Sequence, residues 1–281
     1  MICWLNGHLT DVGVAQIRPD DHGFTIGDGV FETLITKAGV PFALTLHLAR
    51  LAYSAKGLGL PAPNPATVRS AVAAVVHANR PTEDGAELRI RITYTAGPGP
   101  AGSDRSGTAN TTLCVTASPA LPWPDTTSLG LAPWPRNERS ALVGLKTTSY
   151  AENAIALAWA KTQGHAEALL VNLADQVCEG TGSNVFAVIA GEVVTPPLTG
   201  GCLAGITRAL LLRWCQVSER TLTMSDLRGA QEVFITSSTR DVHPVRAIDD
   251  VNYPTPGPRT QHCQRVFAQM AAANPDPTVV R

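Results

Sequence analysis

The sequence lacks the patterns that mark several large classes of protein. Its six cysteines stand singly, without a C-x-x-C pair or paired histidines, so we expect reduced thiols, no disulfide framework and no metal site. No apolar run approaches the roughly 18 residues that span a bilayer, and the first residues do not resemble a signal peptide. Basic runs are absent and the net charge is −1, which disfavours nucleic acid as a partner. We therefore predict a cytoplasmic protein that binds neither nucleic acid nor membranes.

The residues that are present predict a folded α+β protein. With 281 residues, 44% of them hydrophobic, the chain can form one large domain or two of about 100–150 residues. A hairpin is expected at Asn6-Gly7. Further strand-like runs are expected at 30–44, 86–97, 110–120, 167–173, 184–191, 192–197 and 232–238. Helical patterns are expected at 46–60, 65–79, 151–164, 206–216 and 261–272.

A proline-rich stretch divides these patterns into two groups. "SPALPWPDTTSLGLAPWP" should be stiff and poor in backbone donors, because each proline removes an N–H group. We predict an N-terminal α/β domain over 1–118, an interdomain linker over 119–135 and a C-terminal domain over 136–281.

Lys146 is one of only four lysines, and it lies between an apolar stretch and hydroxyl residues in "SALVGLKTTSYAEN". A lysine at a strand end often keeps its charge in water while its stem packs against apolar surface. A desolvated lysine can instead become neutral and attack carbonyl groups. The residue alone does not decide between these two roles.

Other segments offer groups for a ligand, although each also has a plain structural explanation. In "CEGTGSNVF", Glu179 precedes a turn, and a carboxylate fixed there could keep a cofactor's ring nitrogen protonated. Glycines before Ile206 and Thr207 at a helix start could form an anion site. The hydroxyl run Thr236 to Thr239 could donate to phosphate, as could Arg50 in "LHLARL". Taken one at a time, these residues are more often solvated loop residues and a surface arginine.

Taken together, these segments resemble the class-IV (fold-type IV) pyridoxal-phosphate (PLP) enzymes over nearly the whole chain. The run from Glu179 to Arg208 contains "SNVF", "VVT" and "LAGITR" in the order and spacing of the family signature. "DHGFTIGDGVFET" resembles the N-terminal motif, and "HLARL" the helix of the phosphate arginine. "GLKTTSYAENAIAL" resembles the segment of the Schiff-base lysine, and "EVFITSSTRDVHPV" the late phosphate loop.

The resemblance implies a fold and a set of roles. A smaller N-terminal α/β domain and a larger C-terminal domain would hold PLP at their interface, in a homodimer with shared active sites. Lys146 would bind PLP as a Schiff base and move the substrate's α-proton, and Glu179 would pair with the pyridine nitrogen. The remaining cofactor contacts that it implies are Arg50, Ser183, Asn184, Ile206, Thr207, Ser237, Ser238 and Thr239.

The resemblance favours a 4-amino-4-deoxychorismate lyase, which serves folate biosynthesis. Tyr150, four positions after the lysine, is similar to some bacterial lyases, as are the short length and the start "CWLNGHLTD". Branched-chain aminotransferases usually have tyrosine at the position of Ala151. D-Amino-acid aminotransferases usually have tyrosine at the position of Phe31 and an Arg-x-His trap, whereas "AGPGPAGSDRSG" has no histidine. Aminotransferase activity on D-amino or branched-chain acids with 2-oxoglutarate is the alternative, and one protein could have both activities.

As a lyase, the enzyme would release pyruvate and 4-aminobenzoate after Lys146 removes the proton at the amine-bearing carbon. Substrate contacts are expected at Phe31, Arg91 and Tyr150. The arginines available for the substrate carboxylate are Arg89, Arg91, Arg105, Arg136 and Arg139, and the sequence does not choose among them. A PLP-free binding protein of the same fold is a further alternative, but the joint presence of Lys146, Glu179 and Arg50 argues against it.

Overall fold

The computed structural model describes residues 1–83, 85–105 and 110–278. The chain forms two compact units, each with its own sheet. Of the described residues, the first unit contains Met1–Leu121, Leu145–Tyr150 and 275–278. The second contains Pro122–Gly144 and Ala151–Asn274. The α+β class predicted from the sequence is confirmed.

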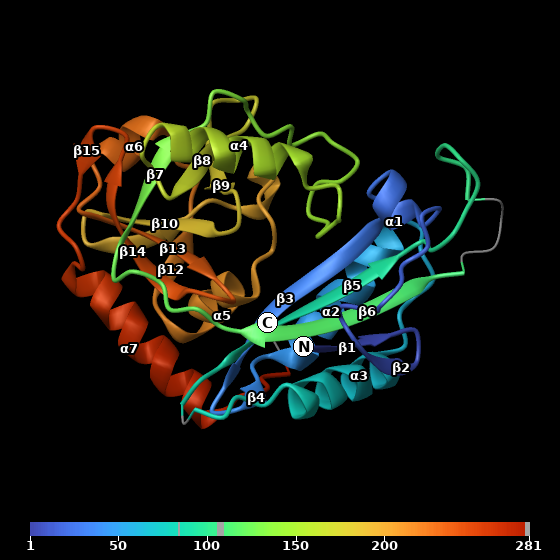
Figure 1. The fold of residues 1–281 in the computed structure, drawn as a ribbon. Helices are drawn as coiled ribbons and strands as arrows, with labels where there is room; N and C mark the ends of the chain where they lie inside the picture. Colours follow the sequence, from blue (N-terminus) through green and yellow to red (C-terminus); the bar gives the residue numbers. More distant parts are fainter. Residues whose placement is uncertain (84, 106–109, 279–281) are drawn as a thin grey trace. The chain divides into compact units, whose positions relative to one another are not determined.

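A six-stranded antiparallel sheet forms the centre of the first unit, in the order β2-β1-β6-β5-β3-β4 (Figure 1). Asn6 and Gly7 both have positive φ, as the tight β1–β2 hairpin requires, and this turn was predicted. The strands are β1 (Ile2–Leu5), β2 (His8–Asp11), β3 (Gly29–Lys37), β4 (Val40–Pro41), β5 (Leu88–Thr95) and β6 (Thr112–Pro119). Their helices are α1 (His22–Thr25), α2 (Leu44–Gly57) and α3 (Pro65–Ala78).

Helices α2 and α3 cover one face of this sheet, and their apolar sides form its core. Leu34, Ile90, Ile92 and Val115 point to that face and are fully buried. Because side chains alternate along a strand, Phe31 on β3 and its partner Thr93 on β5 point to the opposite face. One face of the sheet therefore packs against the helices in an apolar core, and the other face carries polar and aromatic side chains.

The second unit contains a larger, mixed sheet, in which β12-β11-β10-β13-β14-β7-β8-β9 are neighbours and β15 pairs with β14. Three of the pairs, β11–β12, β14–β7 and β7–β8, are parallel. The strands are β7 (Thr127–Leu131), β8 (Glu167–Val171), β9 (Val177–Gly180), β10 (Asn184–Ile189), β11 (Glu192–Thr195), β12 (Val217–Glu219), β13 (Glu232–Ser237), β14 (Asp241–Ile248) and β15 (Val251–Asn252). The helices are α4 (Ala151–Thr162), the 3-10 helix η1 (Leu198–Gly200), α5 (Ile206–Trp214), α6 (Met224–Arg228) and α7 (Pro258–Ala273).

Packing in this unit follows the apolar pattern of the strands. α4 packs on β7 and β8, while α5 and α7 pack on each other and on β13. The core includes the fully buried Leu129, Val185 and Ile235. Pro258 occupies the first turn of α7, where its missing N–H has no intrahelical partner to lose. None of the helices within the described part of the chain is long and apolar enough to cross a membrane.

The structure differs from the predicted boundaries in two places. The segment 119–135, predicted as a linker, contains β7, whose residues Thr127–Leu131 lie between β14 and β8. Residues 145–150 belong to the first unit, because Phe31 N donates to Lys146 O and Thr148 N donates to Gly29 O. Both differences arise because segments far apart in the sequence pair with each other. The local pattern of hydrophobic and polar residues does not indicate such pairing.

Candidate active site

Lys146 lies on a segment that pairs with the start of β3 in antiparallel fashion. Thr147 forms a bridge with Val30, and the flanking hydrogen bonds from Phe31 N to Lys146 O and from Thr148 N to Gly29 O are 2.9 and 2.8 Å long. The Lys146 N–H donates to the buried hydroxyl of Ser54 on α2, at 3.1 Å. The backbone of the lysine is therefore fixed by a strand on one side and a helix on the other.

Aromatic rings surround the Lys146 amine within the first unit. Its Nζ lies 4.3 Å from the ring centroid of Phe31 and 5.9 Å from that of Tyr150. The two rings meet edge to face, with centroids 5.3 Å apart. A cation near a ring face is attracted by the ring's quadrupole, and the rings also exclude water. The three residues predicted as Schiff-base lysine and substrate contacts thus form one cluster.

Arg91 belongs to the same cluster. Its guanidinium carbon lies 3.4 Å from the Phe31 ring centroid, and its Nε donates to Thr93 Oγ1 at 3.3 Å. Burial lowers the pKa of Arg91 to about 10, with opposing contributions from Tyr150 and Glu32, so the side chain stays charged at neutral pH. A charged, partly desolvated arginine beside Lys146 suits a carboxylate ligand.

The other candidate arginines have different surroundings. Arg105 makes a bidentate pair with Asp28, through Nε–Oδ2 at 2.6 Å and Nη2–Oδ1 at 2.5 Å. Arg139 is 86% exposed, and Arg89 is exposed on the same strand as Arg91. Arg136 pairs with a glutamate of the second unit, described below. Within the first unit, Arg91 is therefore the candidate that shares a contact with Lys146.

Arg50 lies on the face of α2 that packs on β3, and it pairs with Glu32. Nε donates to Oε1 at 2.8 Å and Nη2 donates to Oε2 at 2.7 Å, while His47 Nδ1 lies 2.6 Å from Oε2. Burial opposes the ionisation of Glu32, but the charges and hydrogen bonds of Arg50 and His47 outweigh it and lower the pKa of Glu32 to about 2. Burial also lowers the pKa of His47, more than Glu32 raises it. The neutral His47 therefore donates from Nδ1 to an ionised Glu32.

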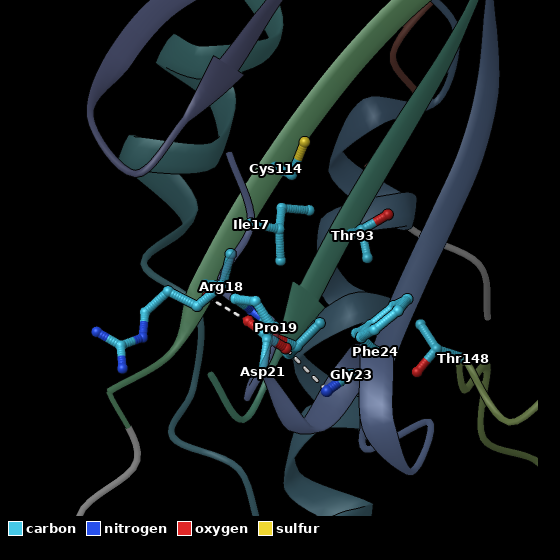
Figure 2. A pocket seen from close by; sticks show the side chains of 11 residues that line it. Ile17, Arg18, Pro19, Asp21, Gly23, Phe24, Thr93, Cys114 and Thr148 are labelled. Carbon is cyan, nitrogen blue, oxygen red and sulfur yellow. Dashed lines mark hydrogen bonds between the residues drawn. The ribbon is translucent and has the colours of Figure 1, made fainter. Parts of the chain in front are cut away.

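A cavity of about 590 Å³ opens on the face of the sheet that carries Thr93. Figure 2 shows Thr93 and Cys114 on neighbouring strands of the sheet, Ile17 and Phe24 from the segment before β3, and Thr148 from the segment after Lys146. The strand side also contributes Thr95 and Thr112. Both of these hydroxyls donate to the buried Asp21, at 2.8 and 2.6 Å. The exposed surface of the cavity is mostly apolar, because these hydroxyls are bound to Asp21, and its lining residue Thr148 lies two positions after Lys146 along the chain.

In the second unit, Glu179 on β9 has one oxygen bound by main chain and the other by an arginine. The Leu203 N–H donates to Oε2 at 2.8 Å, and Arg136 Nη2 lies 3.3 Å from Oε1. Arg136 also contacts Asn153 Oδ1 at 3.4 Å. The side chain of Glu179 is only 11% exposed, and its contacts with Leu203 and Arg136 fix its direction.

A second buried carboxylate, Glu167, holds the turn that follows Glu179. Its Oε1 accepts from Gly182 N at 2.9 Å and from Ser183 Oγ at 2.8 Å. Its Oε2 lies 2.5 Å from Arg240 Nη1 in the β13–β14 turn. Gly180 permits this approach, because a Cβ there would lie 2.5 Å from Glu167 Oε1. Glu167 thereby joins the turn that follows β9 to the β13–β14 turn.

The predicted phosphate donors of the second unit meet near the start of α5. Asn184 Nδ2 donates to Leu203 O at 2.9 Å, and Asn184 faces Thr236 in the strand register. Gly205 caps α5 without a side chain, since a Cβ would lie 1.9 Å from Asn184 Oδ1. The N–H groups of a first helical turn have no intrahelical partners and attract anions. Among the described residues, the buried Thr236 Oγ1 has no hydrogen-bond partner.

The structure therefore assembles the predicted residues in two groups. The group within the first unit consists of Phe31, Arg50, Arg91, Lys146 and Tyr150. The group within the second unit consists of Glu179, Ser183, Asn184, Ile206, Thr207, Ser237, Ser238 and Thr239. Ser237 Oγ and Thr239 Oγ1 lie 3.3 Å apart, Ser238 lies in the turn after β13, and Ile206 and Thr207 begin α5. Ser183 contacts Glu167 with its hydroxyl.

Several residues that shape these groups were missed from the sequence. Glu32, His47 and Ser54 hold Arg50 and Lys146, and the i, i+3, i+7 spacing on α2 was the available signal. The contact of Arg136 with Glu179, and those of Glu167 and Arg240, had no local signal because they join distant segments.

Comparisons with known proteins agree with the family resemblance of the sequence motifs. The family model "Amino-transferase class IV" matches residues 29–248. A protein of Methanocaldococcus jannaschii, provisionally named a branched-chain-amino-acid aminotransferase, is 33% identical over 89% of this chain and 88% of its own. The bifunctional aminodeoxychorismate lyase / D-amino acid transaminase of Mycobacterium tuberculosis is 27% identical over 97% and 98%. The branched-chain aminotransferase structure from Thermoproteus uzoniensis, solved with norvaline, matches with a TM-score of 0.88 at 27% identity, covering 97% and 95%.

Proposed function

Because the chain belongs to the class-IV aminotransferases, a family of pyridoxal-phosphate-dependent enzymes, we propose that Lys146 binds the cofactor aldehyde. We further propose that the enzyme is a 4-amino-4-deoxychorismate lyase, which releases 4-aminobenzoate and pyruvate for folate biosynthesis. The carrying observation is the contact of Arg91 and Lys146 with the same Phe31 ring.

The residues present fit pyridoxal phosphate. The unpartnered hydroxyl of Thr236 and the side-chain-free start of α5 at Gly205 both suit a phosphate. In our proposal Arg50, Ile206, Thr207, Ser237, Ser238 and Thr239 bind that phosphate. Glu179 pairs with the pyridine nitrogen. The Ser183 hydroxyl, which donates to Glu167, holds the turn after Glu179, and the Asn184 amide, which donates to Leu203 O, holds the segment before α5.

The bound cofactor supplies an electron sink for the carbanion formed next to the substrate amine. Lys146 Nζ accepts the proton from the amine-bearing ring carbon, and the half-buried position of the amine between two rings suits a base. The ring C–O bond to the enolpyruvyl group then breaks, the enol takes up a proton as pyruvate, and the ring becomes aromatic. Glu179, held by Leu203 and Arg136, would pair with the pyridine nitrogen and favour its protonated form.

Arg91 is the residue that we propose for the substrate carboxylate. Its guanidinium can bind a carboxylate in a bidentate manner while Phe31 and Tyr150 contact the flat ring of the substrate. The name of the Mycobacterium tuberculosis relative also supports a lyase.

Amino transfer is the second candidate function. The names of the Methanocaldococcus jannaschii and Thermoproteus uzoniensis relatives support transfer from branched-chain amino acids, and the Mycobacterium tuberculosis name supports D-amino acids. For this reaction Lys146 would return the proton to the cofactor carbon instead of assisting elimination. The same chain could perform both reactions.

We also propose that the enzyme is a cytoplasmic homodimer with shared active sites. Segment 9–26 supports self-association, since it exposes large apolar side chains, namely Leu9, Val12, Val14, Ile17, Phe24 and Ile26. The six cysteines are all unpaired, which supports a reducing compartment.

An assay without any amino acceptor separates the two reactions. The purified enzyme is given aminodeoxychorismate with no keto acid, and 4-aminobenzoate is followed by fluorescence. Multiple turnovers support the lyase. If no 4-aminobenzoate forms while D- or L-amino acids react with 2-oxoglutarate, the lyase proposal fails and amino transfer replaces it.

A further inference from the structure

We propose that Glu32 is a positioning residue that orients Arg50 so that one edge of its guanidinium serves the cofactor phosphate. The inference rests on the proposed function, because it assumes that Arg50 binds that phosphate. It goes further in assigning a part to a carboxylate that contacts neither phosphate nor substrate. All of the residues involved belong to the first unit.

The geometry of the pair fixes the arginine in direction as well as in place. Glu32 accepts from Nε at 2.8 Å and from Nη2 at 2.7 Å, so it occupies one side of the planar guanidinium. The Nη1 edge is thereby directed away from Glu32. An isolated arginine side chain rotates among many conformers, and the side-on pair removes most of that freedom.

Glu32 is itself held from a second direction. His47 Nδ1 lies 2.6 Å from Oε2, and the side chains of both His47 and Glu32 are fully buried. His47 and Arg50 are three residues apart on α2, so they lie on the same side of the helix. Ser54, one further turn along this face, accepts the hydrogen bond from Lys146 N. One rigid helix therefore positions both Arg50 and the backbone of Lys146.

The charges of this group cancel. Glu32 is ionised, with a pKa lowered to about 2, Arg50 is positive, and the pKa of His47 is lowered by burial so that the ring is neutral. Arg50 thus contributes oriented donors and little net charge. Removal of the Glu32 charge should strengthen the attraction for phosphate if charge alone matters, and weaken phosphate binding if orientation matters.

The test compares two cofactor forms that differ only in the phosphate. The full-length enzyme is freed of cofactor, and the dissociation constants of pyridoxal phosphate and pyridoxal are measured by visible absorbance. The ratio of the two constants isolates phosphate binding from general damage. The variants are Arg50→Gln, Glu32→Gln, which removes the charge, and Glu32→Asp, which keeps the charge but moves it. Glu232→Gln is the control, since Glu232 is also a buried carboxylate and accepts from Arg259 N and Thr260 N.

We expect the preference for pyridoxal phosphate over pyridoxal to fall about ten-fold or more in Arg50→Gln and in both Glu32 variants. In the double variant of Glu32 and Arg50 the fall should not exceed that of Arg50→Gln alone, because both act through one guanidinium. Glu232→Gln should lower the melting temperature and keep the preference.

Other outcomes overturn the inference and show why. An unchanged preference in both Glu32 variants, with a fall in Arg50→Gln, makes the Glu32 pair merely structural. A stronger preference in Glu32→Gln makes Glu32 a neutralising charge rather than a positioning residue. An unchanged preference in Arg50→Gln removes Arg50 from the phosphate site, and this result contradicts the proposed function itself. If Glu32→Gln does not fold, Glu32→Asp alone still decides between orientation and charge.

Discussion

Each unit contains a fully buried carboxylate, and the two carboxylates are held in different ways. Glu32 in the first unit accepts from side chains of one helix, Arg50 and His47 on α2. Glu167 in the second unit accepts from a turn, through Gly182 N and Ser183 Oγ, and pairs with Arg240 from another turn. The first arrangement is set by helical spacing, and the second by which loops meet at the end of the sheet. The difference predicts which substitutions damage the fold and which damage the chemistry.

The largest effect on stability is expected when Glu167 loses its arginine. Arg240→Gln leaves a buried carboxylate with hydrogen bonds but no opposite charge, and breaking such a pair lowers the free energy of unfolding by about 3–5 kcal/mol. Urea denaturation measures the change. Arg220→Gln is the control, because its pair with Asp226 is 3.8 Å long and half exposed, and a change below about 0.5 kcal/mol is expected there. Equal effects of the two substitutions would contradict a special role for the buried pair.

The next effect concerns catalysis in the second unit. Glu179→Gln keeps the size of the side chain but removes the charge that we assign to the pyridine nitrogen, so kcat should fall by about 10²–10³-fold. Steady-state kinetics with aminodeoxychorismate measure it. Glu152→Gln provides the comparison, since Glu152 is 85% exposed and lies 3.8 Å from the same Arg136. A kcat within about two-fold of the parent in Glu179→Gln would refute the role of Glu179.

Acid should weaken the first unit through Glu32. Its pKa is lowered to about 2 in the folded chain, so the contribution to stability is present above the ordinary carboxyl value of about 4.5. Between these values the unfolded chain binds the proton first, and the contribution of about 3 kcal/mol is lost as the pH falls from 4.5 toward 2. Unfolding measured over this range should show a shallower pH dependence in Glu32→Gln. An identical slope in parent and variant would exclude Glu32 as a source of the acid sensitivity.

The smallest effect is expected at the substrate contact. Arg91→Gln should raise KM for aminodeoxychorismate by about ten-fold while kcat changes less, because the carboxylate is bound in the ground state as well as in the transition state. Arg89→Gln, two residues away on the same strand and exposed, should leave KM within about two-fold. If the two variants behave alike, another arginine binds the carboxylate.

The sequence predicted the elements better than their connections. The spacing of Leu44, Leu48 and Leu51 predicted α2, and alternation in "RIRITY" predicted β5, because burial follows a simple period in both. Strand β7 was missed between prolines, since its place depends on the distant strands β14 and β8. The pairs Arg136–Glu179 and Glu167–Arg240 were missed for the same reason. Motifs thus predicted the candidate residues, while the groups that orient those residues depend on the fold.

The attachment of the cofactor to Lys146 is the central claim, and a chemical trap tests it most directly. The chain has only four lysines, Lys37, Lys56, Lys146 and Lys161. Borohydride reduction of the enzyme with its cofactor, followed by digestion and mass spectrometry, should place the phosphopyridoxyl group on the peptide of Lys146, and Lys146→Ala should lose the label. A stoichiometric label on another lysine, or a label that persists in Lys146→Ala, would contradict the account.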